Sequence, residues 1–308
     1  MASGWAAARP LERVTVAGSD YVRLAEWGES VHCAMKWNKK EGEVELSGPS
    51  TRLNFTIDSR RAEVSGVSVW LSLPVVSRGG APLISPADLA TTIEPLLSPR
   101  KGDARVETVC LDPGHGGKDP GNVSGRNYEK KYTLLLAEET AALLKEQGFK
   151  VVMTRTNDEA VELSDRPLLA GRRGADLFVS LHYNTLDGGT HGVEVFCLTP
   201  AGMGSSDQGG GKSSQAAEAG NAQDERNVLL GYELQKSITR SLPVEDLGLK
   251  RSRFEVLRLA RMPAVLIEGG FLSNAAEAKN IYDAGFRKRM ARAIVNGIVA
   301  YKRAVSRP

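Results

Sequence analysis

The sequence has few cysteines, no long apolar run and no excess of charge of one sign. Its 308 residues contain three cysteines, Cys33, Cys110 and Cys197. They are too few and too dispersed for a disulfide framework, and they form no Cys-x-x-Cys pair. Each lies in an apolar stretch, so we expect buried free thiols. No run of about 18 apolar residues occurs, which argues against a membrane-spanning helix.

The weak net charge narrows the class of protein further. Lys and Arg number 40 against 37 Asp and Glu, a formal charge of +3, without the basic stripe of a dedicated nucleic-acid binder. Hydrophobic residues make up 41% and charged residues 25%, as in an ordinary globular protein, and the length allows about two domains. The first residues lack the apolar core of a signal peptide, which leaves open a cytoplasmic protein and an exported one whose leader has been removed.

The pattern of apolar residues changes near residue 100. From Tyr21 to Leu73, apolar and polar residues alternate in short runs separated by Gly and Pro turns, which predicts a small β-rich unit. Beyond it, short apolar runs alternate with helical patterns, as in a sheet built from strand–helix–strand units. We predict a disordered N-terminus over 1–19, a β-rich accessory domain over 20–97, a linker over 98–105, a larger domain over 106–304 and, within it, a flexible Gly/Ser-rich insertion over 199–226.

The expected fold class of the larger domain is α/β, with a mostly parallel sheet flanked by helices. Strands are predicted over 106–111, 150–154, 177–181, 193–198 and 264–267, and helices over 129–147, 230–238 and 286–301. Ser85 followed by Pro86, and Asn274 followed by Glu277, are typical of helix starts.

Polar side chains follow three of these predicted strands. His115 comes after the first strand, His182 after the third and Glu268 after the last. Ligands bind at the carboxyl edge of open α/β sheets, so these residues can converge, and Glu129 at the start of the first helix is a fourth candidate. Two imidazoles and a carboxylate form the usual catalytic zinc set, and a second carboxylate nearby can accept a proton from a water held there.

Three of the four candidates also have a purely structural interpretation. A single histidine after a strand is more often a satisfied structural residue than a ligand, although the glycines flanking His115 favour close approach to an ion. An acid in the first turn of a helix, such as Glu129, is explained by the helix dipole alone. Glu268 follows an apolar run, where a carboxylate is costly to bury unless it is paired or bound to a metal.

Over about residues 106–304 the sequence resembles the zinc-dependent N-acetylmuramoyl-L-alanine amidases of the type 3 class, which cleave bacterial peptidoglycan. The motifs that carry this resemblance occur in the following order: Leu111-Asp112-Pro113-Gly114-His115-Gly116-Gly117, Gly125-x-x-x-Glu129-Lys130, Thr154-Arg155 with Leu163-x-x-Arg166, Ser180-Leu181-His182-x-Asn184, Gly192-Val193-Glu194-Val195, Val256-Leu257-Arg258, and Met262-Pro263-Ala264-Val265-Leu266-Ile267-Glu268-Gly269-Gly270-Phe271-Leu272-Ser273-Asn274.

The resemblance implies a site and a reaction. His115, Glu129 and His182 match the family's ligands to one Zn²⁺ ion, and Glu268 matches its catalytic glutamate, in a twisted sheet flanked by helices. The bond cut joins the lactyl carboxyl of N-acetylmuramic acid to the L-alanine of the stem peptide. Such a substrate implies a location in the periplasm or the cell wall.

A basic cluster near the last motifs is a candidate for contacts with peptidoglycan. Arg253 and Arg258 are the substrate-binding candidates in it, beside Lys250 and Arg251, because the stem peptides carry carboxylates. A solvated basic face is an equally good interpretation. Asn184 is a further candidate for orienting a ligand or the substrate.

Other polar residues are expected to support the site. Asp112 and Asp119 are candidates for hydrogen bonds to the first histidine, with turn formation as the alternative. Arg155 and Arg166 are typical of the family, and ion pairs that fix loops are their simplest role. His191 is expected at a strand entrance and not as a ligand.

Residues 20–97 resemble the small β-rich domain named after the N-terminal region of copper amine oxidases, which accompanies cell-wall enzymes. The features are Asp20-Tyr21, Val67 to Leu73 with Pro74-Val75, and Ile84-Ser85-x-x-Asp88-Leu89. No cluster of His, Cys or acidic residues in it suggests a metal site of its own, so we expect it to bind the wall, an activator or another partner, or to act as a spacer, and not to be catalytic. Some amidases of the family carry an insertion that blocks the zinc, but a flexible loop is favoured here for 199–226.

Two other functions stay open. The same metal chemistry serves any amide, so a zinc peptidase that cuts within stem peptides is one alternative. A catalytically inactive wall-binding protein is the other, and the presence of all four site residues argues against it.

Overall fold

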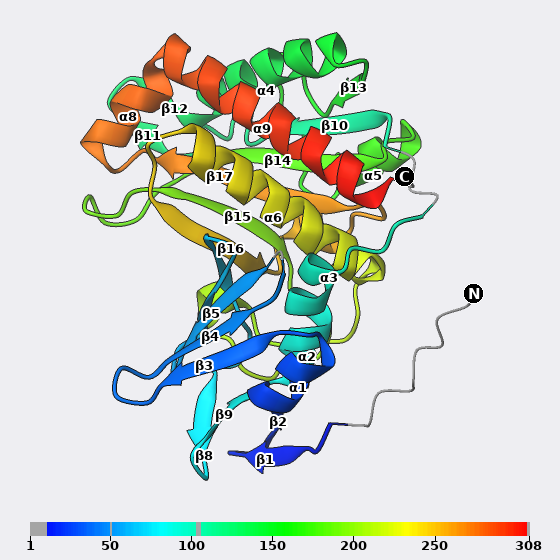
Figure 1. Ribbon diagram of the computed structural model, residues 1–308. Helices are drawn as coiled ribbons and strands as arrows, with labels where there is room; N and C mark the ends of the chain where they lie inside the picture. The colour runs from blue at the N-terminus through cyan, green and yellow to red at the C-terminus, as the bar shows by residue number, and fades with distance from the viewer. Residues whose placement is uncertain (1–10, 50, 103–105, 307–308) are drawn as a thin grey trace.

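A single large sheet joins strands from both halves of the chain in the computed structural model, which describes residues 11–49, 51–102 and 106–306 (Figure 1). The sheet has eleven strands in the order β13-β10-β14-β17-β15-β16-β7-β6-β5-β4-β3. The second half of the chain contributes β10 (Thr108–Pro113), β13 (Lys150–Met153), β14 (Leu177–Asn184), β15 (Val193–Leu198), β16 (Asp246–Ser252) and β17 (Ala264–Phe271). A separate hairpin is formed by β11 (Val123–Ser124) and β12 (Asn127–Tyr128).

The directions of the strands determine where the candidate site lies on the sheet. Strands β13, β10, β14 and β17 are parallel, whereas β15 runs antiparallel to β17 and parallel to β16. The carboxyl ends of β10, β14 and β17 therefore meet at one edge, together with the amino end of β15. This confirms the α/β class and the mostly parallel sheet predicted from the sequence.

Helices cover both faces of this part of the sheet. On one face, α4 (Glu129–Glu146) and α6 (Asp224–Ser241) pack against α9 (Ala284–Val305) and the strands, as Figure 1 shows. The remaining helices of this half are α5 (Asp165–Arg172), α7 (Glu255–Arg258) and α8 (Ala275–Tyr282). Side chains of α5 and α7, including Ala170 and Leu257, are buried with Phe178 and Phe196 in a second apolar cluster.

Both helix starts singled out in the sequence are present. Ser85 caps α2 (Pro86–Asp88), and its side chain accepts a hydrogen bond from the backbone of Asp88. Asn274 caps α8 and accepts from the backbone N–H groups of Ala276 and Glu277. The short polar side chain that each cap requires is the signal that made these positions predictable.

The N-terminal half is β-rich, as predicted, but it also contains helix. Its elements are β1 (Val14–Val16), β2 (Ser19–Arg23), α1 (Leu24–Ser30), β3 (Ala34–Asn38), β4 (Glu43–Ser47), β5 (Arg52–Thr56), β6 (Arg61–Val64), β7 (Val67–Trp70), β8 (Val76–Arg78), β9 (Ala81–Ile84), α2, the π-helical turn η1 (Leu89–Ile93) and α3 (Glu94–Leu97). Helix α1 replaces the alternation predicted there because Leu24 and Trp27, three residues apart, are buried together.

The boundaries of the predicted segments differ from the structure in two places. Residues 14–16, which we expected to be disordered, pair as β1 with β2, while residues 1–10 lie outside the described residues, as do 103–105 of the predicted linker. The predicted boundary near residue 100 does not interrupt the sheet, because β7 pairs with β16. There the Ser68 N–H donates to Asp246 at 2.8 Å, and Tyr232 donates to the Val64 carbonyl at 3.0 Å.

The insertion over 199–226 has more buried residues than its composition suggested. It contains the 3₁₀ turns η2 (Ser206–Gln208) and η3 (Ala219–Gln223), and both Ser205 and Ser206 are buried. The Gly211 N–H donates to the Ser72 carbonyl at 2.7 Å, so part of the insertion lies against the N-terminal half.

The cysteines are as their apolar surroundings predicted. All three cysteines are buried free thiols. Among the described residues, no helix combines the length and the apolar character needed to cross a bilayer.

Candidate metal centre and active site

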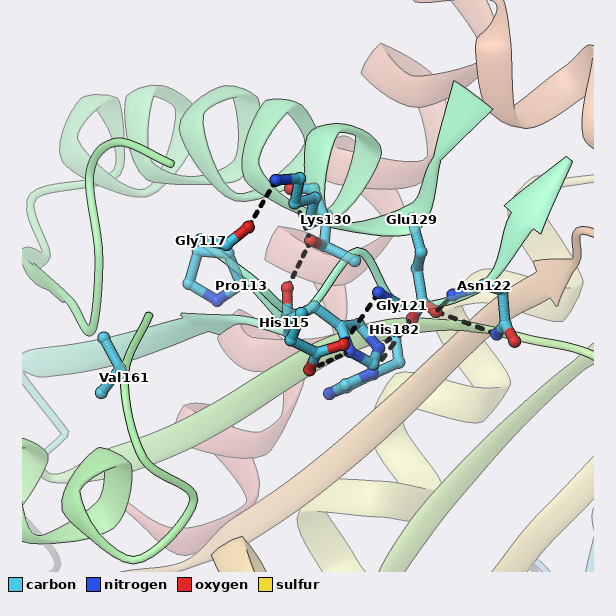
Figure 2. Close-up of polar contacts among 12 residues, drawn as sticks. Pro113, His115, Gly117, Gly121, Asn122, Glu129, Lys130, Val161 and His182 are labelled. Carbon is cyan, nitrogen blue, oxygen red and sulfur yellow. Dashed lines mark hydrogen bonds and ion pairs between the residues drawn. The ribbon is translucent and has the colours of Figure 1, made fainter. Parts of the chain in front are cut away.

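Three side chains predicted from distant parts of the sequence meet at the carboxyl edge of the sheet (Figure 2). Oε1 of Glu129 lies 3.0 Å from Nε2 of His115 and 3.1 Å from Nδ1 of His182. The two imidazole rings are 4.8 Å apart at an interplanar angle of 78°. His115 follows β10, Glu129 opens α4 and His182 lies on β14, so three separate elements aim their donor atoms at one point.

The residues fit a divalent metal of the zinc type. Nitrogen, nitrogen and carboxylate oxygen is the donor set of many catalytic zinc sites, and the three ligand atoms lie within 4.8 Å of one another. Ligand atoms bound at about 2.0–2.1 Å in tetrahedral geometry are separated by roughly 3.3 Å, close to the observed contacts. Burial raises the pKa of Glu129, but the two histidines outweigh burial and hold that pKa well below its ordinary value.

The backbone around the first histidine is shaped by close contacts. His115 has a φ of 63°, which is uncommon for a residue other than glycine. A Cβ on Gly114 would lie 2.2 Å from Cε1 of His182, and one on Gly121 would lie 2.6 Å from Cδ2 of His115. Glycines at these positions therefore let the backbone approach both imidazoles.

Hydrogen bonds from outside the triad fix the orientation of its members. Oδ2 of Asp119 lies 2.8 Å from Nδ1 of His115, which leaves Nε2 facing Glu129. The second oxygen of Glu129 accepts from the backbone and the side chain of Asn122, both at 2.9 Å, and Oε1 accepts from the Tyr183 N–H. Asp119 was a candidate for this role, whereas Asn122 was missed, since it belongs to no distinctive pattern.

Two buried arginines hold the loop that carries His115. Arg155 donates to the carbonyls of Pro113 and Gly114 at 3.0 and 2.8 Å. Arg166 donates to the His115 carbonyl at 3.0 Å and forms an ion pair with the fully buried Asp112 at 2.8 Å. Asp112 thus supports the loop through Arg166, and its oxygens do not bond the histidine ring as one interpretation of the sequence suggested.

Glu268 lies beside the triad on β17. Its Cα is the ladder partner of His182 on β14, and its Oε2 is buried with no hydrogen-bond partner within the part of the chain that the structure describes. Burial first, then the charges of Glu129 and Glu194, raise its pKa well above the ordinary value. A buried carboxylate oxygen with no partner of its own is free to bond a substrate or a water molecule.

The remaining substrate-binding candidates lie in contacts within the protein. Asn184 donates to Glu194 at 2.7 Å, Arg253 donates to the carbonyls of Pro200 and Met203, each at 3.0 Å, and Arg258 pairs with Glu218 at 3.1 Å. The two arginines therefore hold the insertion, and a role in binding substrate remains a prediction for all three residues.

Glu194 and Lys250 are two further residues beside the site, and the sequence did not single them out for a role there. Glu194 is buried beside Glu268 and forms an ion pair with Lys250. Glu194 belongs to one of the family motifs, and Lys250 belongs to the basic cluster. Only the pairing of β15 with β16 and β17 shows that these two side chains lie next to each other.

Comparison with known proteins identifies the larger part of the chain. Residues 109–300 match the family model described as N-acetylmuramoyl-L-alanine amidase. The chain is 33% identical over 195 residues to the protein YqiI of Bacillus subtilis, covering 63% of this chain and 84% of YqiI. It is 31% identical over 198 residues to the amidase LytC of the same organism, covering 64% of this chain but 36% of LytC.

A solved structure agrees with this match. An N-acetylmuramoyl-L-alanine amidase from Clostridium difficile 630 is 32% identical, with a TM-score of 0.54, and the alignment covers 64% of this chain and 97% of that one. Since the family model spans more than half of the chain and includes the triad and Glu268, this protein belongs to the N-acetylmuramoyl-L-alanine amidase family.

Proposed function

We propose that this chain hydrolyses the amide bond between N-acetylmuramic acid and L-alanine in peptidoglycan, with one zinc ion held by His115, Glu129 and His182. The observation that supports the metal is the convergence of donor atoms from three residues. Asp119 fixes the other ring nitrogen of His115, and Asn122 fixes the other oxygen of Glu129. Zinc, when bound, lowers the pKa of a water molecule toward about 7 and polarises the amide carbonyl.

Glu268 acts as the general base and acid in this proposal. Its carboxylate accepts the proton of the attacking water and returns that proton to the nitrogen of the departing L-alanine, because an amide nitrogen leaves poorly until it is protonated. Its burial next to His182 and the free Oε2 support this role. Intact peptidoglycan lies outside the cytoplasmic membrane, so this proposal includes a location in the periplasm or the cell wall, with a partner or activator bound to the N-terminal unit.

The test is hydrolysis of purified peptidoglycan by the wild type and by Glu268→Gln, with metal content measured on both. We expect the variant to retain zinc and to lose about 10²–10⁴-fold in rate. Glu138→Gln, on the exposed side of α4, is the matched control and should be as active as the wild type. Released stem peptides with a free L-alanine amino terminus support the amidase; cleavage between stem amino acids supports a peptidase, and no cleavage supports a wall-binding protein.

A further inference from the structure

Two glutamates lie side by side next to the triad. Glu194 on β15 and Glu268 on β17 are ladder partners in an antiparallel pair, so their side chains leave the same face of the sheet. Glu194 is only 3% exposed. Like charges at directly opposed positions repel, and burial strengthens the repulsion, so an unpaired Glu194 would displace the Glu268 carboxylate.

Both oxygens of Glu194 have partners, one from β16 and one from β14. Lys250 forms an ion pair with Oε2, and the Asn184 amide donates to Oε1 at 2.7 Å. Glu268, by contrast, keeps a buried oxygen without a partner among the described residues. Lys250 therefore offsets the charge of Glu194 while it leaves Glu268 free.

The N-terminal unit holds Lys250 in place. The Lys250 ammonium lies 5.6 Å from the centroid of the Trp70 ring, within reach of a cation–π interaction. Trp70 ends β7, and its Nε1 donates to the Leu247 carbonyl on β16 at 2.9 Å, so the ring is tied to the strand that carries Lys250. A contact thus runs from the N-terminal unit through Lys250 and Glu194 to Glu268.

We propose that Lys250 is a positioning residue for Glu268 and acts through Glu194. In this proposal Trp70, which belongs to the N-terminal unit, holds Lys250 in place. This inference rests on the proposed amidase function. Lys250 acts only through its ion pair with Glu194; by offsetting that charge it lets the Glu268 carboxylate stay beside His182.

The test compares kcat and KM on a soluble peptidoglycan fragment, with zinc content measured for every variant. Lys250→Met should lower kcat by about tenfold or more, with KM and zinc content near those of the wild type. Lys250→Arg should keep most of the rate. The double variant Lys250→Met/Glu194→Gln should return to the level of Glu194→Gln alone, about threefold below the wild type, because the charge that Lys250 offsets is gone.

Matched controls separate this effect from general loss of stability. Lys236 also pairs with a glutamate, Glu233 at 3.5 Å, and also lies over an aromatic ring, Tyr232 at 5.4 Å, but on α6, so Lys236→Met should leave kcat unchanged. Trp70→Leu should lower kcat by about threefold. Trp37→Leu also removes a ring that lies under a lysine, but it should leave kcat unchanged.

Either of two results would overturn the proposal. One is a kcat for Lys250→Met within about twofold of the wild type, and the other is a double variant that is no faster than Lys250→Met. Should Lys250→Met fail to fold, a double variant that folds and works supports the coupling, and one that also fails to fold counts against it. A wild type that releases no product counts against the amidase function itself, which the variants do not test.

Discussion

Asp119 bonds Nδ1 of His115 at 2.8 Å and thereby determines that Nε2 faces Glu129. The four-residue spacing places the carboxylate within the same turn as the histidine, and the Gly121 N–H donates to its other oxygen at 3.0 Å. The orientation of the His115 ring is therefore set by a residue outside the triad.

Removal of this carboxylate should weaken metal binding. We expect Asp119→Ala to lower zinc affinity by about 10–100-fold, because the ring loses the partner that orients it. Competition with a chelator of known affinity measures the change, and Glu138→Gln on exposed α4 is the control for loss of one carboxylate. Equal affinities for Asp119→Ala and the wild type would show that the loop backbone alone orients His115.

A methyl group at Gly114 should disrupt the centre sterically. The added Cβ would lie 2.2–2.6 Å from three atoms of the His182 ring, so the ring must move and zinc content should fall. Gly102→Ala is the matched control, since its Cβ would meet nothing within 4 Å. Metal analysis of the purified variant measures the change. Full zinc occupancy of Gly114→Ala would contradict the close approach of Gly114 to the His182 ring.

Arg166 should matter for stability more than an exposed ion pair does. Arg166→Met leaves the fully buried Asp112 without its charged partner, and we expect a loss of about 3–5 kcal/mol in the free energy of unfolding. Arg52→Met removes a pair with Glu45 at 3.7 Å in which the arginine is 66% exposed, and should cost about 0–1 kcal/mol. Urea denaturation measures both, and similar losses for the two variants would exclude the proposed difference.

His191 should contribute to stability only in its protonated form. Its hydrogen bond to the Gly189 carbonyl, followed by the charge of Glu245, raises its pKa above the ordinary value. A pKa that is higher in the folded protein gives stability that is present below the unfolded pKa and lost as the pH rises through the folded one. The urea midpoints of the wild type and His191→Gln should therefore differ at pH 5 and converge near pH 9. A difference between the midpoints that does not change with pH would contradict this prediction.

The sequence predicted the parts of the protein that depend on local pattern or on the order of motifs. The strand over 193–198 and the helix starting at Glu129 have the predicted bounds to within a residue or two, because apolar periodicity and turn residues determine them locally. The convergence of His115, His182 and Glu268 followed from the rule that parallel strands end at one edge, whereas Glu129 entered the ligand set through the family resemblance. Among the elements that were missed are α5, whose short segment is rich in charge, and β16, whose pattern lacks a continuous apolar run.

Contacts across the sheet could not be predicted. The pairing of β7 with β16 depends on register between segments about 180 residues apart, and nothing in either segment specifies its partner. The same holds for Glu194 and Lys250, whose functional interest arises only from the strands they lie on. Long-range register is where a single sequence carries the least information.

The shared sheet also determines how the N-terminal unit can transmit position. Strands β3 to β7 and the strands that carry the active site are connected by hydrogen bonds without a break, so the two parts cannot swing about a hinge at residue 100. If the outer strands bind the cell wall, the amide bonds that the active site can reach lie at one fixed distance from the point of attachment. A flexible tether would allow a range of distances, whereas this protein would cut the polymer at a set interval from its anchor.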